Sequence, residues 1–169
     1  MLKGLNPQQR AERSHRLEAN LLQHLTTLEP LSVVGLYLPL WEEPRWDFAR
    51  WAMFPWQLAF PAAKEGEPQY RLPVGQIPAK GAWVGMDGPL AHPDVLVVPG
   101  LAFSPHGWRL GRGGGWYDRL LEHERPRHGC IGVCFEEQLR DGWEPEAHDR
   151  KMDVIVTDAR VWQCPRDGD

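Results

Sequence analysis

Asp94-Val95-Leu96-Val97-Val98-Pro99-Gly100 is the clearest strand signal in the sequence. Its uninterrupted apolar run predicts a strand buried on both faces, and Pro99-Gly100 ends that strand. Shorter apolar runs at residues 32–38, 130–135 and 154–157 predict further strands of the same kind. Such strands, separated by helical stretches, are typical of a mostly parallel sheet covered by helices on both faces.

Helical patterns precede and follow this strand. Asn6 followed by Pro7 predicts a helix start, because an asparagine side chain caps helices well and proline suits the first helical position. Pro30 is expected to end this helix. The buried face of the helix is predicted from leucines at three- and four-residue steps: Leu17, Leu21, Leu25 and Leu28. Further elements are expected as helices at 46–53 and 116–123 and as strands at 57–60 and 70–74.

Length and composition restrict the class of protein. A chain of 169 residues is long enough for one domain with a real core, and we expect one three-layer α/β/α domain over residues 1–169. A net charge of −4 argues against a general nucleic-acid or membrane-surface binder. The sequence contains no apolar run near the roughly 20 residues that cross a bilayer, and no export signal. Its three cysteines fit a reducing cytoplasm. We therefore expect a cytoplasmic protein, as a monomer or a small homo-oligomer.

The loop after the buried strand is Arg109-Leu110-Gly111-Arg112-Gly113-Gly114-Gly115-Trp116-Tyr117-Asp118. Glycines let backbone N–H groups approach an anion, and arginines donate forked hydrogen bonds to phosphate or carboxylate. The two aromatic rings offer faces for a flat ligand, and Asp118 is a possible ligand for a hard cation such as Mg²⁺. The spacing matches neither the P-loop nor the dinucleotide-binding motif. A glycine-rich surface turn therefore stays open as an alternative.

A second candidate group lies at residues 145–153. Asp149 and Asp153 are four residues apart, so a helical turn would place both on one side as Mg²⁺ ligands. Taken alone, this spacing favours a solvated charged turn, with Arg150 and Lys151 offsetting the acids, over a metal site. His148 beside them is more typical of a structural histidine than of a catalyst.

Two other groups are considered. Cys130 and Cys134, with His123 and His128 upstream, suggest zinc, but no second ligand pair has zinc-like spacing, so buried structural cysteines are expected. The acidic pair Glu42-Glu43 follows the first predicted strand, where a carboxylate can accept hydrogen bonds from an amino-substituted heterocycle. An exposed loop acid is the alternative reading.

Several ordered motifs together resemble the 5-formyltetrahydrofolate cyclo-ligase family, also called methenyltetrahydrofolate synthetases. The main ones are the segments 99–103 and 107–118, which join a Pro-Gly-Leu-Ala-Phe lead-in to the glycine–arginine loop. Later matches follow in the family's order at 132–138, Pro145, His148-Asp149 and Met152-Asp153. The resemblance extends from about residue 5 to residue 158, more loosely in the first half, where it includes the segment 37–43.

The resemblance implies an α/β fold and the closure of 5-formyltetrahydrofolate to 5,10-methenyltetrahydrofolate, with ATP as co-substrate and Mg²⁺ as cofactor. It implies that Arg109 and Arg112 act in catalysis, that Asp118 and Asp149 hold Mg²⁺, and that Leu38 and Glu43 face the pterin. The implied ATP-binding residues are Arg109, Leu110, Gly111, Arg112, Gly113, Gly114, Gly115, Trp116 and Tyr117. The implied folate-side residues of the loop are Arg112, Gly113, Gly114, Gly115 and Trp116. Reduced folate and ATP are therefore the expected small-molecule partners.

The chain departs from the family pattern at two places. Members usually carry a Lys-x-x-x-Arg segment near the N-terminus that reaches the ATP phosphates, and Lys3 matches only the stretch after it. Arg10, Arg13 or Lys3 are candidates to replace those cations. Trp116 stands where a tyrosine is usual. A catalytically altered relative that binds folate or nucleotide is therefore the alternative function, and a sugar-phosphate or CoA-handling enzyme on a similar sheet is a third.

Overall fold

The computed structural model describes residues 4–28, 30–40, 42–62, 67–77, 88–123 and 125–168. Its main sheet has eight strands in the order β10-β9-β8-β5-β1-β2-β3-β4, and the short strands β6 and β7 pair separately. The helices and the short 3-10 helix are α1 (Pro7–Leu25), α2 (Phe48–Trp51), α3 (Trp116–His123) and η1 (Glu136–Gln138). The strands are β1 (Val33–Gly35), β2 (Gln57–Ala62), β3 (Gln69–Arg71), β4 (Leu90–Ala91), β5 (Val95–Pro99), β6 (Ala102–Phe103), β7 (Arg109–Leu110), β8 (Cys130–Val133), β9 (Val154–Val156) and β10 (Val161–Gln163).

The centre of the sheet is parallel and its two edges are antiparallel. Strands β2, β1, β5, β8 and β9 run parallel, while β10 at one edge and β3 and β4 at the other pair antiparallel. The expected mostly parallel α/β fold is confirmed. The edge strands β4 and β10 and the hairpin of β6 and β7 were not predicted, because strands this short carry little periodic signal.

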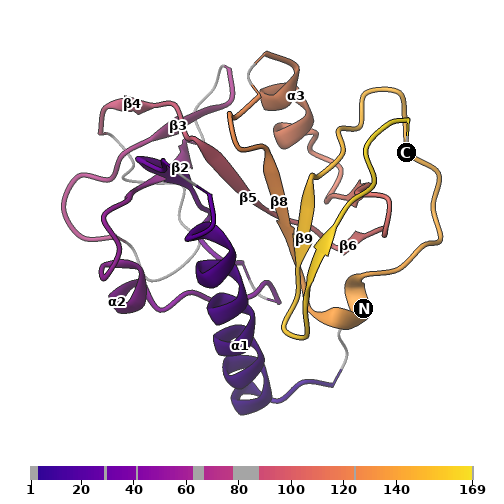
Figure 1. Ribbon diagram of the computed structural model, residues 1–169, viewed down its shortest axis with the longest axis horizontal. Helices are drawn as coiled ribbons and strands as arrows, with labels where there is room; N and C mark the ends of the chain where they lie inside the picture. The colour runs from indigo at the N-terminus through magenta and orange to yellow at the C-terminus, as the bar shows by residue number, and fades with distance from the viewer. Residues whose placement is uncertain are drawn as a thin grey trace.

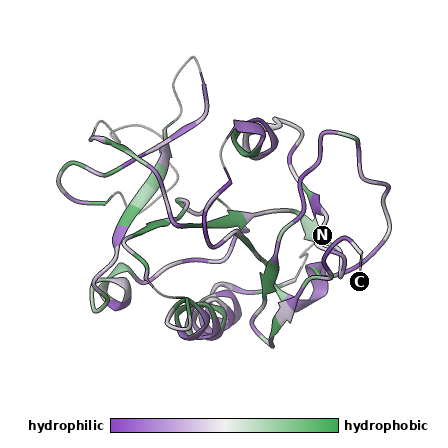
Figure 2. Ribbon diagram, turned by 45° about the horizontal axis from the view of Figure 1, so that its top comes forward, coloured by the Kyte–Doolittle hydropathy of each residue, from purple (hydrophilic) through white to green (hydrophobic). Residues whose placement is uncertain are grey.

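Strand β5 shows why the sheet needs a helix on each face. Its alternate residues enter different cores: Val95 and Val97 pack with α1, whereas Leu96 and Val98 pack with residues of α3. Figure 2 shows helices on both sides of the central strands, and Figure 1 shows α1 crossing one face. A continuous apolar run is therefore required, because neither face of β5 meets water.

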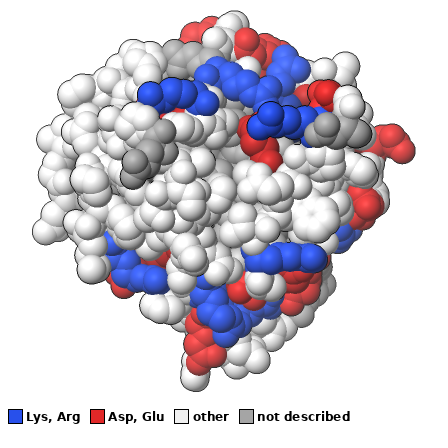
Figure 3. Space-filling model, viewed as in Figure 1, with Lys and Arg blue, Asp and Glu red and all other residues white. Residues whose placement is uncertain are grey.

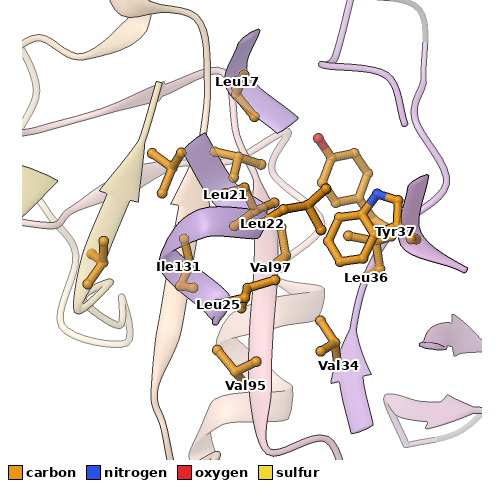
Figure 4. Close-up of a cluster of buried hydrophobic side chains, with 14 of the residues drawn as sticks. Leu17, Leu21, Leu22, Leu25, Val34, Leu36, Tyr37, Val95, Val97 and Ile131 are labelled. Carbon is orange, nitrogen blue, oxygen red and sulfur yellow. The ribbon is translucent and has the colours of Figure 1, made fainter. Parts of the chain in front are cut away.

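Helix α1 begins where the sequence predicts. The Asn6 side chain accepts from the Gln9 backbone N–H, and the Gln9 side chain accepts from the Asn6 N–H, which completes a capping box. The helix ends at Leu25 rather than at Pro30, so Leu28 lies beyond it and is only half-buried. The remaining leucines of the stripe are buried against the sheet (Figure 4).

Replacing Leu21 by alanine will lower the free energy of unfolding by about 2–5 kcal/mol, because it leaves a cavity in a close-packed core. Leu21 has no exposed surface and packs in the cluster between α1 and the sheet. Urea unfolding followed by circular dichroism measures the change. Met53→Ala is the control, because that side chain is 83% exposed and its loss should alter stability little. Equal losses for the two variants would contradict the assigned core.

Candidate functional site

A cleft of about 170 Å³ lies at the carboxyl ends of the central strands, where ligands bind in open α/β sheets. Its walls come from the ends of β2 and β5, from the segment after β1, and from the loop before α3. The sequence-predicted residues that line it are Leu38, Glu43, Arg109, Arg112, Gly114, Gly115, Trp116 and Tyr117. The other predicted loop residues, Leu110, Gly111 and Gly113, are their neighbours in the chain and do not line the cleft themselves.

The glycine loop turns sharply before entering α3. Gly113 and Gly115 have φ values of 91° and 63°, in the left-handed region that side chains disfavour. The Arg119 guanidinium, one turn along α3, donates to the Gly114 carbonyl at 2.7 Å and holds the turn against the helix. The first N–H groups of α3 have no acceptor within the helix, so the loop carries donors suited to an anion.

Arg109 and Arg112 occupy different positions around the cleft. Arg109 is half-buried, donates from Nη1 to the Pro99 carbonyl at 3.1 Å, and lies 5.1 Å from the centre of the Tyr117 ring. This cation–π contact and hydrogen bond keep the Arg109 charge against one wall. Arg112 has half of its side chain exposed, and its Nη2 lies 3.7 Å from Glu43 Oε1.

Glu43 belongs to a compact turn at the edge of the cleft. Its Oε2 accepts from the Leu40 backbone N–H at 2.9 Å, and its own N–H donates to the Leu40 carbonyl at 2.8 Å. Burial raises the pKa of Glu43, while the Leu40 hydrogen bond and the Arg112 charge partly oppose that rise. The buried carboxylate therefore faces the cleft with an arginine opposite, and the exposed loop acid is ruled out for Glu43.

Asp118 and Asp149 lie together although they are distant in the sequence. With His148 they form a group whose possible ligand atoms all lie within 4.8 Å of one another. Asp118 also accepts from the Arg150 N–H at 3.3 Å, and Asp149 accepts from the Glu146 N–H at 2.7 Å. Two carboxylates and an imidazole at this spacing fit a divalent cation. None of the three lines the cleft, but Asp118 follows the cleft-lining Tyr117 directly in the chain.

The side-by-side placement of Asp149 and Asp153 that a helical turn would give does not occur. Residues 145–153 form turns and irregular structure rather than a helix, so their four-residue spacing does not bring the two side chains to one face. Asp153 instead accepts from the Cys130 backbone N–H at 2.8 Å and lies 3.4 Å from the Arg125 guanidinium. The Asp153 carboxylate therefore links the start of strand β8 to the segment before β9.

The cysteines are structural, as expected. Cys130 and Cys134 are buried in the core beneath α3, and burial raises the pKa of Cys130 to about 12. Both side chains pack among apolar residues of that core, as buried strand cysteines do. Within the described ranges, the group at Asp118 is the one set of three candidate metal ligands, and it contains no cysteine.

Arg13 is engaged elsewhere and does not supply the phosphate-binding cation considered for it. Its guanidinium contacts Asp158 at 2.7 Å and Glu137 at 2.6 Å, and it lies over the Phe135 ring. These contacts join α1 to η1 and to the turn after β9. Lys3 lies outside the described residues, and Arg10 makes contacts of its own.

Arg13→Gln will destabilise the protein by about 1–3 kcal/mol near pH 7, because it removes charged hydrogen bonds. Arg13 lowers the pKa of Glu137 and of Asp158 in the folded state. A lowered carboxyl pKa contributes stability above the unfolded pKa and loses it as pH falls through the folded value. The difference between wild type and variant should therefore shrink below about pH 4. Urea midpoints measured from pH 7 to pH 3 test this, and a constant difference would contradict it.

Some residues of the cleft were not identified from the sequence. Phe60 and Pro61, at the carboxyl end of β2, line it, and so does Tyr37 beside Leu38. The Tyr37 hydroxyl donates to the Pro44 carbonyl at 3.2 Å, which fixes the turn that carries Glu43. The signal that points to Phe60 and Pro61 is topological: β2 neighbours β1, so its carboxyl end adjoins the same cleft.

The fold and the cleft define an α/β protein with a glycine–arginine loop at the carboxyl ends of a mostly parallel sheet, and with a candidate cation site formed by residues of α3 and of the segment before β9. The family model described as the 5-formyltetrahydrofolate cyclo-ligase family matches residues 72–158, slightly more than half of the chain. The chain therefore belongs to the 5-formyltetrahydrofolate cyclo-ligase family.

Individual members of this family also match the chain in sequence. The chain is 37% identical over 76 residues to 5-formyltetrahydrofolate cyclo-ligase of Escherichia coli K12, which covers 44% of this chain and 42% of the relative. It is 39% identical over 71 residues to that of Mycolicibacterium smegmatis, covering 42% of this chain and 37% of the relative. These matches span about two fifths of the length of the curated relatives.

Solved structures resemble the whole chain. The 5,10-methenyltetrahydrofolate synthetase of Aquifex aeolicus has a TM-score of 0.76 and 29% identity, covering 98% of this chain and 87% of that one. The 5,10-methenyltetrahydrofolate synthetase of Mycoplasma pneumoniae has a TM-score of 0.77 and 18% identity, covering 92% and 90%. At 18% identity, the likeness to the Mycoplasma pneumoniae structure shows a shared fold. No helix in the described ranges is both long and apolar enough to span a membrane.

Proposed function

We propose that this protein uses ATP and Mg²⁺ to close 5-formyltetrahydrofolate into 5,10-methenyltetrahydrofolate, releasing ADP and phosphate. The observation that carries the proposal is a cleft lined by both the glycine–arginine loop and the buried Glu43. The carboxylates of Asp118 and Asp149 lie together, next in the chain to the cleft-lining Tyr117, and supply a candidate cation site. Membership of the family supports the same activity.

The chemistry needs charge neutralisation and positioning more than a protein nucleophile. The formyl oxygen of the folate is itself the nucleophile toward the γ-phosphate of ATP, and N10 then attacks the activated carbon while phosphate leaves. Phosphoryl transfer depends on cations and N–H donors aimed at the transferred group. The loop from Arg109 to Tyr117 would bind the nucleotide, with Arg109 and Arg112 as the catalytic cations.

Each wall of the cleft then has a role. Leu38 and Glu43 would face the pterin, with the apolar side of Leu38 against its ring and the Glu43 carboxylate accepting from its N–H groups. Residues 112–116 would lie between folate and nucleotide. Asp118 and Asp149 would hold Mg²⁺, which when bound offsets the negative charge of the nucleotide phosphates.

Incubating the full chain with MgATP and 5-formyltetrahydrofolate should produce the absorbance of the methenyl product and one ADP for each product formed. Omission of ATP, and chelation of the metal, are the matched controls and should each abolish the signal. Binding of folate or nucleotide without turnover would reject the enzyme and favour a binding protein on the same fold.

A further inference from the structure

A second cavity lies at the amino ends of the central strands, whereas the cleft lies at their carboxyl ends. It has a volume of about 380 Å³, in the range of small-molecule sites, and shares no lining residue with the cleft. Its walls are the segment between β4 and β5, the last turn of α3, and the turn that precedes β8. It is therefore placed at the amino ends of β5 and β8, where the proposed reaction uses no residue.

The lining of this rear cavity separates into an apolar floor and a basic rim. The floor contains the buried side chains of Leu96, Leu120 and Tyr70. The rim contains two histidines and two arginines: His92, His123, Arg125 and Arg127. Its described lining residues include no acid, although the chain has 23 acidic and 19 basic residues and a net charge of −4.

Each of the two rim arginines also contacts protein groups that do not line the cavity. Arg127 donates from Nη2 to the Pro30 carbonyl at 2.6 Å and to Asp94 Oδ1 at 2.9 Å. Arg125 contacts Asp153 Oδ1 through its Nη2 at 3.4 Å. Within the described residues these contacts use one nitrogen of each guanidinium, so the remaining N–H groups are available to a ligand on a partly ordered side chain.

A neighbouring cavity of about 390 Å³ continues the floor, because both cavities are lined by Tyr70, His92, Leu120 and His123. Glu67 lines that neighbour, so the cationic character is confined to the end near Arg125 and Arg127. Figure 3 shows both basic and acidic side chains along the top of the molecule, where α3 lies in Figure 1. The arrangement suits a ligand with an anionic head at one end and an apolar body extending along the floor.

The geometry points to the rear cavity as a binding site for a phosphomonoester with an aromatic or aliphatic body. The guanidinium groups of Arg125 and Arg127 donate in a fork that suits the three terminal oxygens of a phosphate, whereas a carboxylate presents two oxygens. The apolar floor accounts for the body. The site is separate from the proposed nucleotide cleft and does not depend on the proposed activity.

Phenyl phosphate is a suitable probe, and its binding to the full chain can be measured by isothermal titration calorimetry. We expect a Kd near or below about 1 mM, as for a ligand of this size, with inorganic phosphate and benzyl alcohol each at least about tenfold weaker. The double variant His123→Gln/Arg125→Gln should weaken binding at least about tenfold. Both side chains lie at the surface, so the melting temperature should not change.

Two further variants locate the binding. Arg166→Gln removes an exposed arginine outside the cavity and should leave the affinity unchanged. Arg112→Gln impairs the cleft and should also leave it unchanged. Loss of binding in Arg112→Gln but not in the double variant would place the probe in the cleft and overturn the proposal. Absence of binding at 10 mM, or equal affinity for benzoate, would overturn it as well.

Discussion

Asp118→Asn will lower the Mg²⁺-dependent turnover of 5-formyltetrahydrofolate at least about 100-fold, because it replaces a charged metal ligand by a neutral amide. Asp118 and Asp149 are the two carboxylates of the three-residue group beside the cleft. Asparagine keeps the size of the side chain and its acceptor oxygen, so the hydrogen bond from the Arg150 N–H can persist. The folded structure should therefore be little disturbed.

The measurement is the initial rate against Mg²⁺ concentration for wild type and variant. Asp149→Asn should raise the Mg²⁺ concentration for half-maximal rate in the same way. Glu122→Gln is the matched control, because it removes an exposed acid from the same helix without touching the cation site. An Asp118→Asn enzyme with the wild-type rate and the wild-type Mg²⁺ requirement would show that this carboxylate holds no catalytic metal.

Arg112→Gln will lower kcat by about 10²–10³-fold while changing the KM for ATP much less, because the lost cation acts mainly on charge that develops during phosphoryl transfer. Arg112 is suited to this role by its position. Half of its side chain is exposed, and it faces the buried Glu43 carboxylate at 3.7 Å across the cleft. It therefore lines the cleft, where the proposed substrates would bind, without being part of the core.

The conservative change Arg112→Lys should recover part of kcat, because an ammonium keeps the charge and loses the fork. Arg45→Gln is the control, because it removes an exposed arginine close in sequence to Glu43 and outside the cleft lining. Thermal unfolding should give similar melting temperatures for all three variants. A raised KM with an unchanged kcat would assign Arg112 to ground-state binding alone and contradict the catalytic role.

Local signals account for the parts of the fold that could be predicted. The bounds of α3 agree with the expected residues 116–123, and β5 lies within one residue of its predicted position. The first helix was located by its cap, which is a contact between residues three apart. Edge strands such as β4 and β10 could not be predicted, because two or three residues carry too little pattern and their pairing depends on neighbours distant in the chain.

The kinds of functional group could be recognised from the sequence: a sheet buried on both faces, a loop rich in glycine and arginine after its central strand, and acids suited to a cation. Which of these groups meet depends on the three-dimensional packing of the chain. It joined Asp118 to Asp149 and directed Asp153 to the Cys130 backbone N–H. It also placed Glu43 opposite Arg112 and engaged Arg13 with Glu137 and Asp158. The physical reason is that periodicity and capping act within a few residues, whereas the partner of a charged side chain is chosen by packing between distant segments.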